Sequence, residues 1–244
     1  MINKTIFDLG FFNGDDTDFY LKKGFRVIAI DANPAMIEAG TIRFSEQLET
    51  SQLILLNRAI SKCSGDLEFY INSSKPDWSS CNKGMAESDG SQSNIVNVQG
   101  ITIQDLFNEF GMPYYMKVDV EGVDVTIAKQ ITLQHIFPEY VSFELNKNDF
   151  SSIFSYLFIA GYREFQLVNQ SLHRTRKLPV EQKEGYSIEY NFSPYSSGPF
   201  GKDLPEKKWL TYNEVISRYI KYRELKLIDN EELALGWLDL HAKY

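Results

Sequence analysis

The chain has 244 residues, of which 43% are hydrophobic and 24% are charged, and these fractions are those of a globular protein rather than a disordered one. The net charge is −8 and the acidic excess lies in residues 1–165, so a nucleic-acid partner is not expected. No apolar run is long enough to span a bilayer, and two cysteines cannot form a disulfide framework. A strand-like run starts at residue 5, so we expect no secretory leader. We therefore expect a cytoplasmic protein without a membrane span.

Strand-like and helix-like segments alternate through the first 165 residues, which is typical of a parallel α/β sheet. The predicted strands are, in chain order, 5–9, 25–31, 53–59, 65–72, 114–120, 140–145, 164–168 and 187–192, the last as the antiparallel partner of the one before it. The predicted helices are 15–23, one that begins at Pro34 with Asn33 as its cap, 102–110, 123–133, 149–160, 212–226 and 231–243. Residues 73–94 are polar and rich in turn formers, and we expect a long functional loop there.

A glycine-containing turn follows the first predicted strand. Such a turn lets the backbone approach a ligand closely and directs free amides at it. Asp31 ends the second strand, twenty-one positions after Gly10, where a carboxylate can accept hydrogen bonds from both hydroxyls of a ribose. The combination indicates a nucleoside-containing cofactor, and the alternative is a plain Asx/Gly turn before an exposed acidic helix. The predicted cofactor residues, including one from the rim described below, are Asp8, Gly10, Asn13, Gly14, Asp31, Asn33 and Asp119.

The charge of this turn discriminates between cofactors. Asp15, Asp16 and Asp18 follow it directly, and three carboxylates at a helix N-terminus would repel a diphosphate. The third glycine of a dinucleotide fingerprint is missing, and no Gly-Lys-Ser/Thr phosphate loop occurs. A cationic sulfonium would be tolerated, so S-adenosyl-L-methionine fits and NAD does not.

Three carboxylates are predicted at the carboxyl edge of the sheet, where open α/β sheets bind their ligands. Asp119 and Glu121 close the strand 114–120, and Glu144 lies near the end of the strand 140–145. Each is a candidate base for an acceptor hydroxyl, although one or two of them could instead cap a helix or pair with Lys117. We predict no metal site, because nothing in their spacing demands one. His135, His173 and His241 fall off this rim and are expected to be structural or exposed.

Aromatic residues mark the remaining candidate contacts. Trp78, Ser79 and Ser80, within the long loop, could stack on and hydrogen-bond to an adenine or a sugar, and we predict that they bind substrate; the alternative is that Trp78 pins the loop to the core. The turn 196–201 could be a lid or a structural crossing. The aromatic spacing near the C-terminal end suits core packing or the surface of a homodimer.

Several segments together resemble the FkbM-type methyltransferases, a branch of the class I S-adenosylmethionine-dependent enzymes. They are FDLGFFNGDDTDFYLKKGFRVIAIDANP, NRAISKCSGDLEFY, DWSS, YYMKVDVEG, YVSFEL and SSGPFGKDLP. The resemblance implies a Rossmann-like α/β fold with a seven-stranded, mostly parallel sheet, one antiparallel strand and helices on both faces. We expect this methyltransferase domain over residues 1–205 and a C-terminal helical extension, packed on it, over 206–244.

The resemblance also implies O-methylation of a hydroxyl on a small molecule or sugar, as in polysaccharide or secondary-metabolite biosynthesis. Asp8, Gly10 and Gly14 would shape the methionine end of the cofactor site, and Asp31 would hold the ribose. Phe11 and Phe12 stand where the family most often has Ala and Asn, which favours one alternative, an inactive cofactor-binding assembly protein. The other alternative is an NAD-dependent oxidoreductase.

Overall fold

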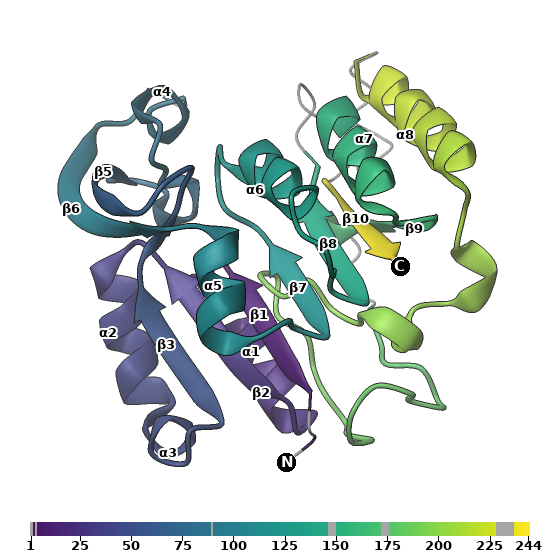
Figure 1. Ribbon diagram of the computed structural model, residues 1–244, viewed down its shortest axis with the longest axis horizontal. Coiled ribbons are helices and arrows are strands. Elements are labelled where there is room, and N and C mark those ends of the chain that lie inside the picture. The colour runs from purple at the N-terminus through teal and green to yellow at the C-terminus, as the bar shows by residue number, and fades with distance from the viewer. Residues whose placement is uncertain (1, 3, 89, 146–149, 172–175, 228–236) are drawn as a thin grey trace.

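A seven-stranded sheet forms the centre of the computed structural model, which describes all residues except 1, 3, 89, 146–149, 172–175 and 228–236 (Figure 1). The strands stand in the order β3-β2-β1-β7-β8-β10-β9. Strand β10 is antiparallel to both of its neighbours, and the other pairings are parallel. The expected mostly parallel sheet of seven strands with one reversed strand is therefore confirmed. Its strands are β1 (Thr5–Leu9), β2 (Arg26–Asp31), β3 (Leu53–Asn57), β7 (Tyr115–Val118), β8 (Tyr140–Glu144), β9 (Glu164–Asn169) and β10 (Leu238–Lys243).

Helices pack on both faces of this sheet. One face is covered by α5 (Ile103–Phe110), α6 (Asp124–Ile131), α7 (Phe150–Ala160) and α8 (Tyr212–Leu227). The other face is covered by α1 (Asp15–Lys22), by α2 (Pro34–Arg43) with α3 (Ser45–Glu49), and by residues from the segment 178–209.

Alternate residues of each central strand supply the two cores. Phe7 and Leu9 of β1 belong to the core beneath α5 to α8, whereas Ile6 belongs to the core beneath α1. Both faces are buried, which explains why these strands read as nearly continuous apolar runs rather than as an alternating pattern. On the α1 face, Phe200 stacks on Tyr115 with ring centroids 4.5 Å apart and so ties the late segment to the sheet.

Local signals explain where two of the helices begin. The side chain of Asn33 accepts a hydrogen bond from the amide of Ala35, so the predicted cap of α2 is confirmed. Thr102 and Asp105 form a reciprocal capping box at the start of α5.

A smaller sheet stands beside the main one. It contains β4 (Ala59–Ile60), β6 (Ser93–Ile101) and β5 (Gly65–Asn72) in that order. The predicted strand 53–59 is therefore two strands, one in each sheet, and the hairpin arm 65–72 is confirmed by its antiparallel pairing with β6. The loop 73–94 contains a short turn of helix (Pro76–Trp78) and α4 (Lys83–Ala86), and its last residues begin β6.

Two predicted elements are wrong. Residues 187–192 form no strand, and the antiparallel partner of β9 is β10. Where a helix over 231–243 was expected, Leu238–Lys243 form β10, and 231–236 lie outside the described residues. Asp149, the predicted first residue of α7, also lies outside them. The division into residues 1–205 and 206–244 stays a prediction, with the qualification that β10 lies inside the main sheet rather than in a helical extension.

No helix in the described part of the chain has the length and apolar character needed to cross a membrane.

Candidate functional site

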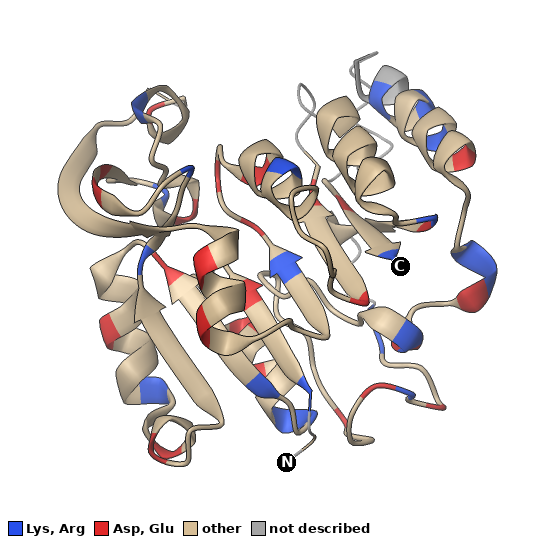
Figure 2. Cartoon of the chain, in the orientation of Figure 1, with Lys and Arg blue, Asp and Glu red and all other residues tan. Residues whose placement is uncertain are grey.

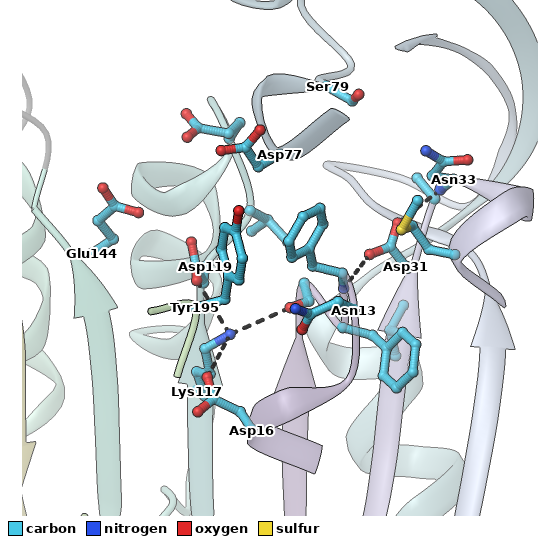
Figure 3. Close-up of a pocket in the computed structure, with 18 of the residues that line it drawn as sticks. Asn13, Asp16, Asp31, Asn33, Asp77, Ser79, Lys117, Asp119, Glu144 and Tyr195 are labelled. Carbon is cyan, nitrogen blue, oxygen red and sulfur yellow. Dashed lines mark hydrogen bonds and ion pairs between the residues drawn. The ribbon is translucent and has the colours of Figure 1, made fainter. Parts of the chain in front are cut away.

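A cavity of about 520 Å³ lies at the carboxyl ends of β1, β2, β7 and β8. Figure 3 shows Asp31 and Asn33 at one end and Glu144 at the other, with Lys117 and Asp119 between them. Figure 2 shows acidic residues, in red, at the ends of the central strands. Among the described residues, the charged lining comprises seven carboxylates and two cations, namely Asp16, Asp31, Asp77, Asp119, Glu121, Glu144 and Asp239 with Arg58 and Lys117. The described lining is therefore rich in carboxyl groups.

The turn after β1 passes tightly between neighbouring strands. Gly10 has a φ of +93°, and a Cβ atom placed on it would lie 1.9 Å from the carbonyl oxygen of Asp119. Only glycine fits at this position, because a side chain would collide with backbone that cannot move aside. The close approach fixes the turn against the end of β7 and so fixes the floor of the cavity.

Asp31 ends β2 and organises this turn. Its carboxylate accepts hydrogen bonds from the amides of Phe12 at 2.7 Å and Asn33 at 2.8 Å. Burial raises the pKa of Asp31, and these two hydrogen bonds oppose that rise. Each carboxylate oxygen accepts one amide and keeps capacity for a second donor, which suits a ligand that offers two hydroxyls.

Lys117 is the buried cation of the site, and its ammonium group bridges the acidic residues beneath the cavity. Its Nζ atom lies 3.5 Å from Asp8, 3.3 Å from Asp16 and 3.2 Å from Asp119. The carboxylates surrounding Lys117 raise its pKa well above the usual value, against the opposing effect of burial. Lys117 therefore stays charged and holds Asp119 at the cavity edge.

The carboxylates on the rim differ in their surroundings. Asp119 is 41% exposed and paired with Lys117. Burial raises the pKa of Glu121 to about 7, with smaller contributions from Asp119 and Asp77. Burial also raises the pKa of Glu144, and the charges of Asp119 and Asp239 raise it further. Burial thus brings the pKa of Glu121 close to neutrality, as a general base requires.

The loop after β5 forms the opposite wall. Trp78 and Ser79 line the cavity, and the Nζ of Lys75 lies 3.8 Å from the centroid of the Trp78 ring. The Ser79 hydroxyl donates to the carbonyl of Pro76 at 2.7 Å and accepts from the amide of Asn72. Tyr195 also lines the cavity, and its ring lies 5.5 Å from that of Phe12 between centroids.

A comparison with protein families gives a match of residues 8–164, more than half of the chain, to the methyltransferase FkbM domain. The chain belongs to the FkbM methyltransferase family. The matched residues run from β1 to the first residue of β9 and include Asp31 and the three rim carboxylates. A comparison with curated proteins finds no match.

Nine of the twelve residues predicted for the site line the cavity of this FkbM domain, and three do not. The nine are Gly10, Asn13, Asp31, Asn33, Trp78, Ser79, Asp119, Glu121 and Glu144. Asp8 lies fully buried beneath the cavity, where it accepts from Thr17 at 2.6 Å. Gly14 caps α1 and packs against Phe11 and Phe44. Ser80 is buried and donates to the carbonyl of Glu121 at 2.6 Å, so it holds the rim from behind.

Several residues of this cavity were not named for the site by the sequence analysis, although Ser197 lies in the turn 196–201 that it marked as a lid or a structural crossing. Asp239 lies on β10 and Gln170 directly follows β9, and the side-chain amide of Gln170 donates to Asp239. Tyr195 and Ser197 come from the late segment, where the amide of Ser197 donates to Asp16 at 2.8 Å. All four lie beyond residue 164, outside the matched part of the chain. Apart from the turn that holds Ser197, only Asp239 among these four residues had a signal in the sequence. In β10, Leu238, Leu240 and Ala242 alternate with polar residues, which is the pattern of a strand.

The histidines fall where the sequence analysis expected them, as far as they are described. His135 is exposed, and His241 is buried in β10. Burial lowers the pKa of His241 to about 3, so it is neutral at physiological pH. His173 lies outside the described residues. No three histidine, cysteine or acidic side chains are arranged as a metal site within the described ranges.

Proposed function

We propose that the chain transfers a methyl group from S-adenosyl-L-methionine to a hydroxyl of a small molecule or sugar. The observation that carries the proposal is the acidic cavity at the carboxyl edge of a sheet in an FkbM methyltransferase domain. The described part of the lining holds seven carboxylates against two cations, which suits a ligand that carries a sulfonium and an ammonium and disfavours a diphosphate.

The lining residues fit this cofactor by their chemistry. Asp31 would accept the ribose hydroxyls, and Asp119 would pair with the ammonium of the methionine part. When bound, the cofactor supplies an electrophilic methyl group on its sulfonium. The protein's own contribution is to orient the acceptor for in-line attack and to take the hydroxyl proton as the bond forms. Glu121 is the proposed base, because its pKa of about 7 leaves a large ionised fraction at neutral pH.

Binding of S-adenosylhomocysteine tests the cofactor directly. Calorimetry is expected to show that the protein binds S-adenosylhomocysteine more tightly than NAD. Asp16 borders the cavity at the start of α1, where its carboxylate would repel the diphosphate of NAD. Tighter binding of NAD would end the methyltransferase proposal and favour the oxidoreductase alternative. Methyl transfer to an acceptor would then separate the enzyme from an inactive binding protein.

Removal of the Asp31 carboxylate tests the ribose contact. Asp31→Ala is expected to weaken binding of S-adenosylhomocysteine by roughly 1.5–3 kcal/mol, the usual contribution of hydrogen bonds to a charged group. Asp31→Asn keeps an acceptor for the turn amides and so guards against a folding defect. Asp66→Ala, at an exposed position on β5, is the matched control. Unchanged affinity in folded Asp31 variants would remove Asp31 from the cofactor site.

A further inference from the structure

A second cavity, of about 450 Å³, lies against the first one. Both cavities are lined by Trp78, Asp119, Val120, Glu121, Glu144 and Trp237. These shared residues include all three candidate bases. The second cavity therefore lies where an acceptor would meet the cofactor, and its lining describes the chemistry of that acceptor.

The charged lining of the second cavity is mostly negative. Among the described residues it comprises four carboxylates and one guanidinium, those of Asp119, Glu121, Asp124, Glu144 and Arg223. The guanidinium carbon of Arg223 lies 5.2 Å from the centroid of the Phe150 ring. In their ionised forms these carboxylates repel a phosphorylated or carboxylated acceptor and attract a cation, and a cation in turn stabilises the ionised forms.

Asp124 has one buried carboxyl oxygen, Oδ1, without a hydrogen-bond partner in the described structure. Asp124 is the first residue of α6 and lines the second cavity but not the first. A buried carboxylate oxygen without a donor is costly and uncommon, so a donor is expected from the occupant of the cavity.

Aromatic side chains also line the second cavity. Trp78 and Trp237 lie at 36% and 44% exposure, and Tyr219 and Tyr222 of α8 line the same cavity. Aromatic rings attract cations and also pack on apolar ring faces. Aromatic and acidic side chains in one cavity are the combination that recognises an amine on a carbon skeleton.

We propose that the second cavity binds the acceptor and selects one that carries an ammonium group beside the hydroxyl that is methylated. Its role as the acceptor site rests on the proposed function, whereas the preference for a cation rests on the lining alone. The ammonium donates to Asp124, and Glu121 and Glu144 lie on the wall shared with the cofactor cavity.

The protonation of the lining carboxylates agrees with this assignment. Burial and the charges of Asp119 and Glu121 raise the pKa of Asp124 well above its usual value. The pKa values of Glu121 and Glu144 are raised in the same way. A cation that enters the cavity stabilises the ionised forms, so its binding is accompanied by release of protons to the buffer.

Three compounds that share a ring and a hydroxyl and differ in charge test the preference. They are trans-2-aminocyclohexanol, trans-cyclohexane-1,2-diol and trans-2-hydroxycyclohexanecarboxylate, titrated into the protein at neutral pH and followed by NMR. The amine is expected to bind roughly 10- to 100-fold more tightly than the diol, the range for hydrogen bonds to a charged group, and the acid more weakly still. Equal affinities, a reversed order, or no binding of the amine would overturn the proposal.

Two variants test whether the preference for the amine arises in the second cavity. Asp124→Asn is expected to lose most of the preference for the amine while S-adenosylhomocysteine still binds, because Asp124 does not line the first cavity. Glu109→Gln changes the net charge equally at an exposed position on α5 and should retain the preference. A preference that survives Asp124→Asn would overturn the assignment.

The titrations are run with and without S-adenosylhomocysteine, so that the two proposals fail separately. Absence of S-adenosylhomocysteine binding would count against the proposed function alone, whereas its binding without discrimination among the three compounds would count against this inference alone.

Discussion

Glu121→Gln is expected to slow methyl transfer by roughly 10²–10⁴-fold, the usual contribution of a general base. The amide keeps the shape of the side chain and removes its ability to take a proton. Glu121 lines both cavities, and burial raises its pKa to about 7. The measurement is single-turnover methyl transfer once an acceptor is known, because this isolates the chemical step from cofactor binding and product release.

The pH profile identifies the base independently of the rate. A base acts when deprotonated, so the parental rate is expected to rise with pH up to about 7 and to level off above it. This rise should be absent from Glu121→Gln and present in Glu109→Gln, which alters an exposed carboxylate outside both cavities. If Glu121→Gln keeps the parental rate and profile, Asp119→Asn and Glu144→Gln are the variants that would locate the base.

Lys117→Met is expected to lower the free energy of unfolding by about 3–5 kcal/mol at pH 7, the range for breaking a buried ion pair by removing one partner. The ammonium of Lys117 lies within 3.5 Å of Asp8, 3.3 Å of Asp16 and 3.2 Å of Asp119. Its removal would leave Asp8 and Asp16 buried together without the ammonium group that bridges them. Urea unfolding followed by circular dichroism measures the loss.

The pH dependence of this loss separates the lost charge from lost packing. Burial raises the pKa of Asp8, and the charge of Lys117 opposes the rise, so the variant should raise this pKa further. A carboxyl whose pKa is higher in the folded state than in the unfolded state loses stability as pH rises through that interval. The loss is therefore expected to be smaller at pH 5 than at pH 8.

Lys202→Met is the matched control for the stability measurement, because Lys202 is 48% exposed and its Nζ lies 3.7 Å from Glu139. An exposed pair of this kind contributes about 0–1 kcal/mol. A loss for Lys117→Met as small as that of the control, or one that grows as the pH falls, would contradict the assigned role of Lys117.

The order of the first strands and helices could be predicted from sequence because their signals are local. Asn33 caps α2, Thr102 caps α5, and the buried strands are short apolar runs. Residues 187–192 show where a local pattern is insufficient. Ile188, Tyr190 and Phe192 alternate as in a strand and pack against the core beneath α1, yet the backbone of Ile188 bonds to the side chain of Gln182 rather than to a neighbouring strand.

The candidate site likewise contains residues that the sequence could reveal and residues that it could not. Asp31 and Asp119 could be found because each ends a recognisable strand at the carboxyl edge of the sheet. Asp239 could not, since its place beside Glu144 depends on pairing between β10 and β8, which are distant in the chain. The buried Oδ1 of Asp124 is likewise set by packing around the start of α6, and sequence spacing says nothing about packing.

The position of β10 between β8 and β9 has a consequence for folding kinetics. Strands β3, β2, β1, β7 and β8 pair with one another directly, whereas β9 joins the main sheet through β10 alone. The edge strand β9 therefore cannot form its backbone hydrogen bonds with the sheet until a much later segment has inserted beside it. Such a distant pairing has a high loop-closure entropy, so this edge should be the slow step of refolding and the first part of the sheet to exchange its amide hydrogens.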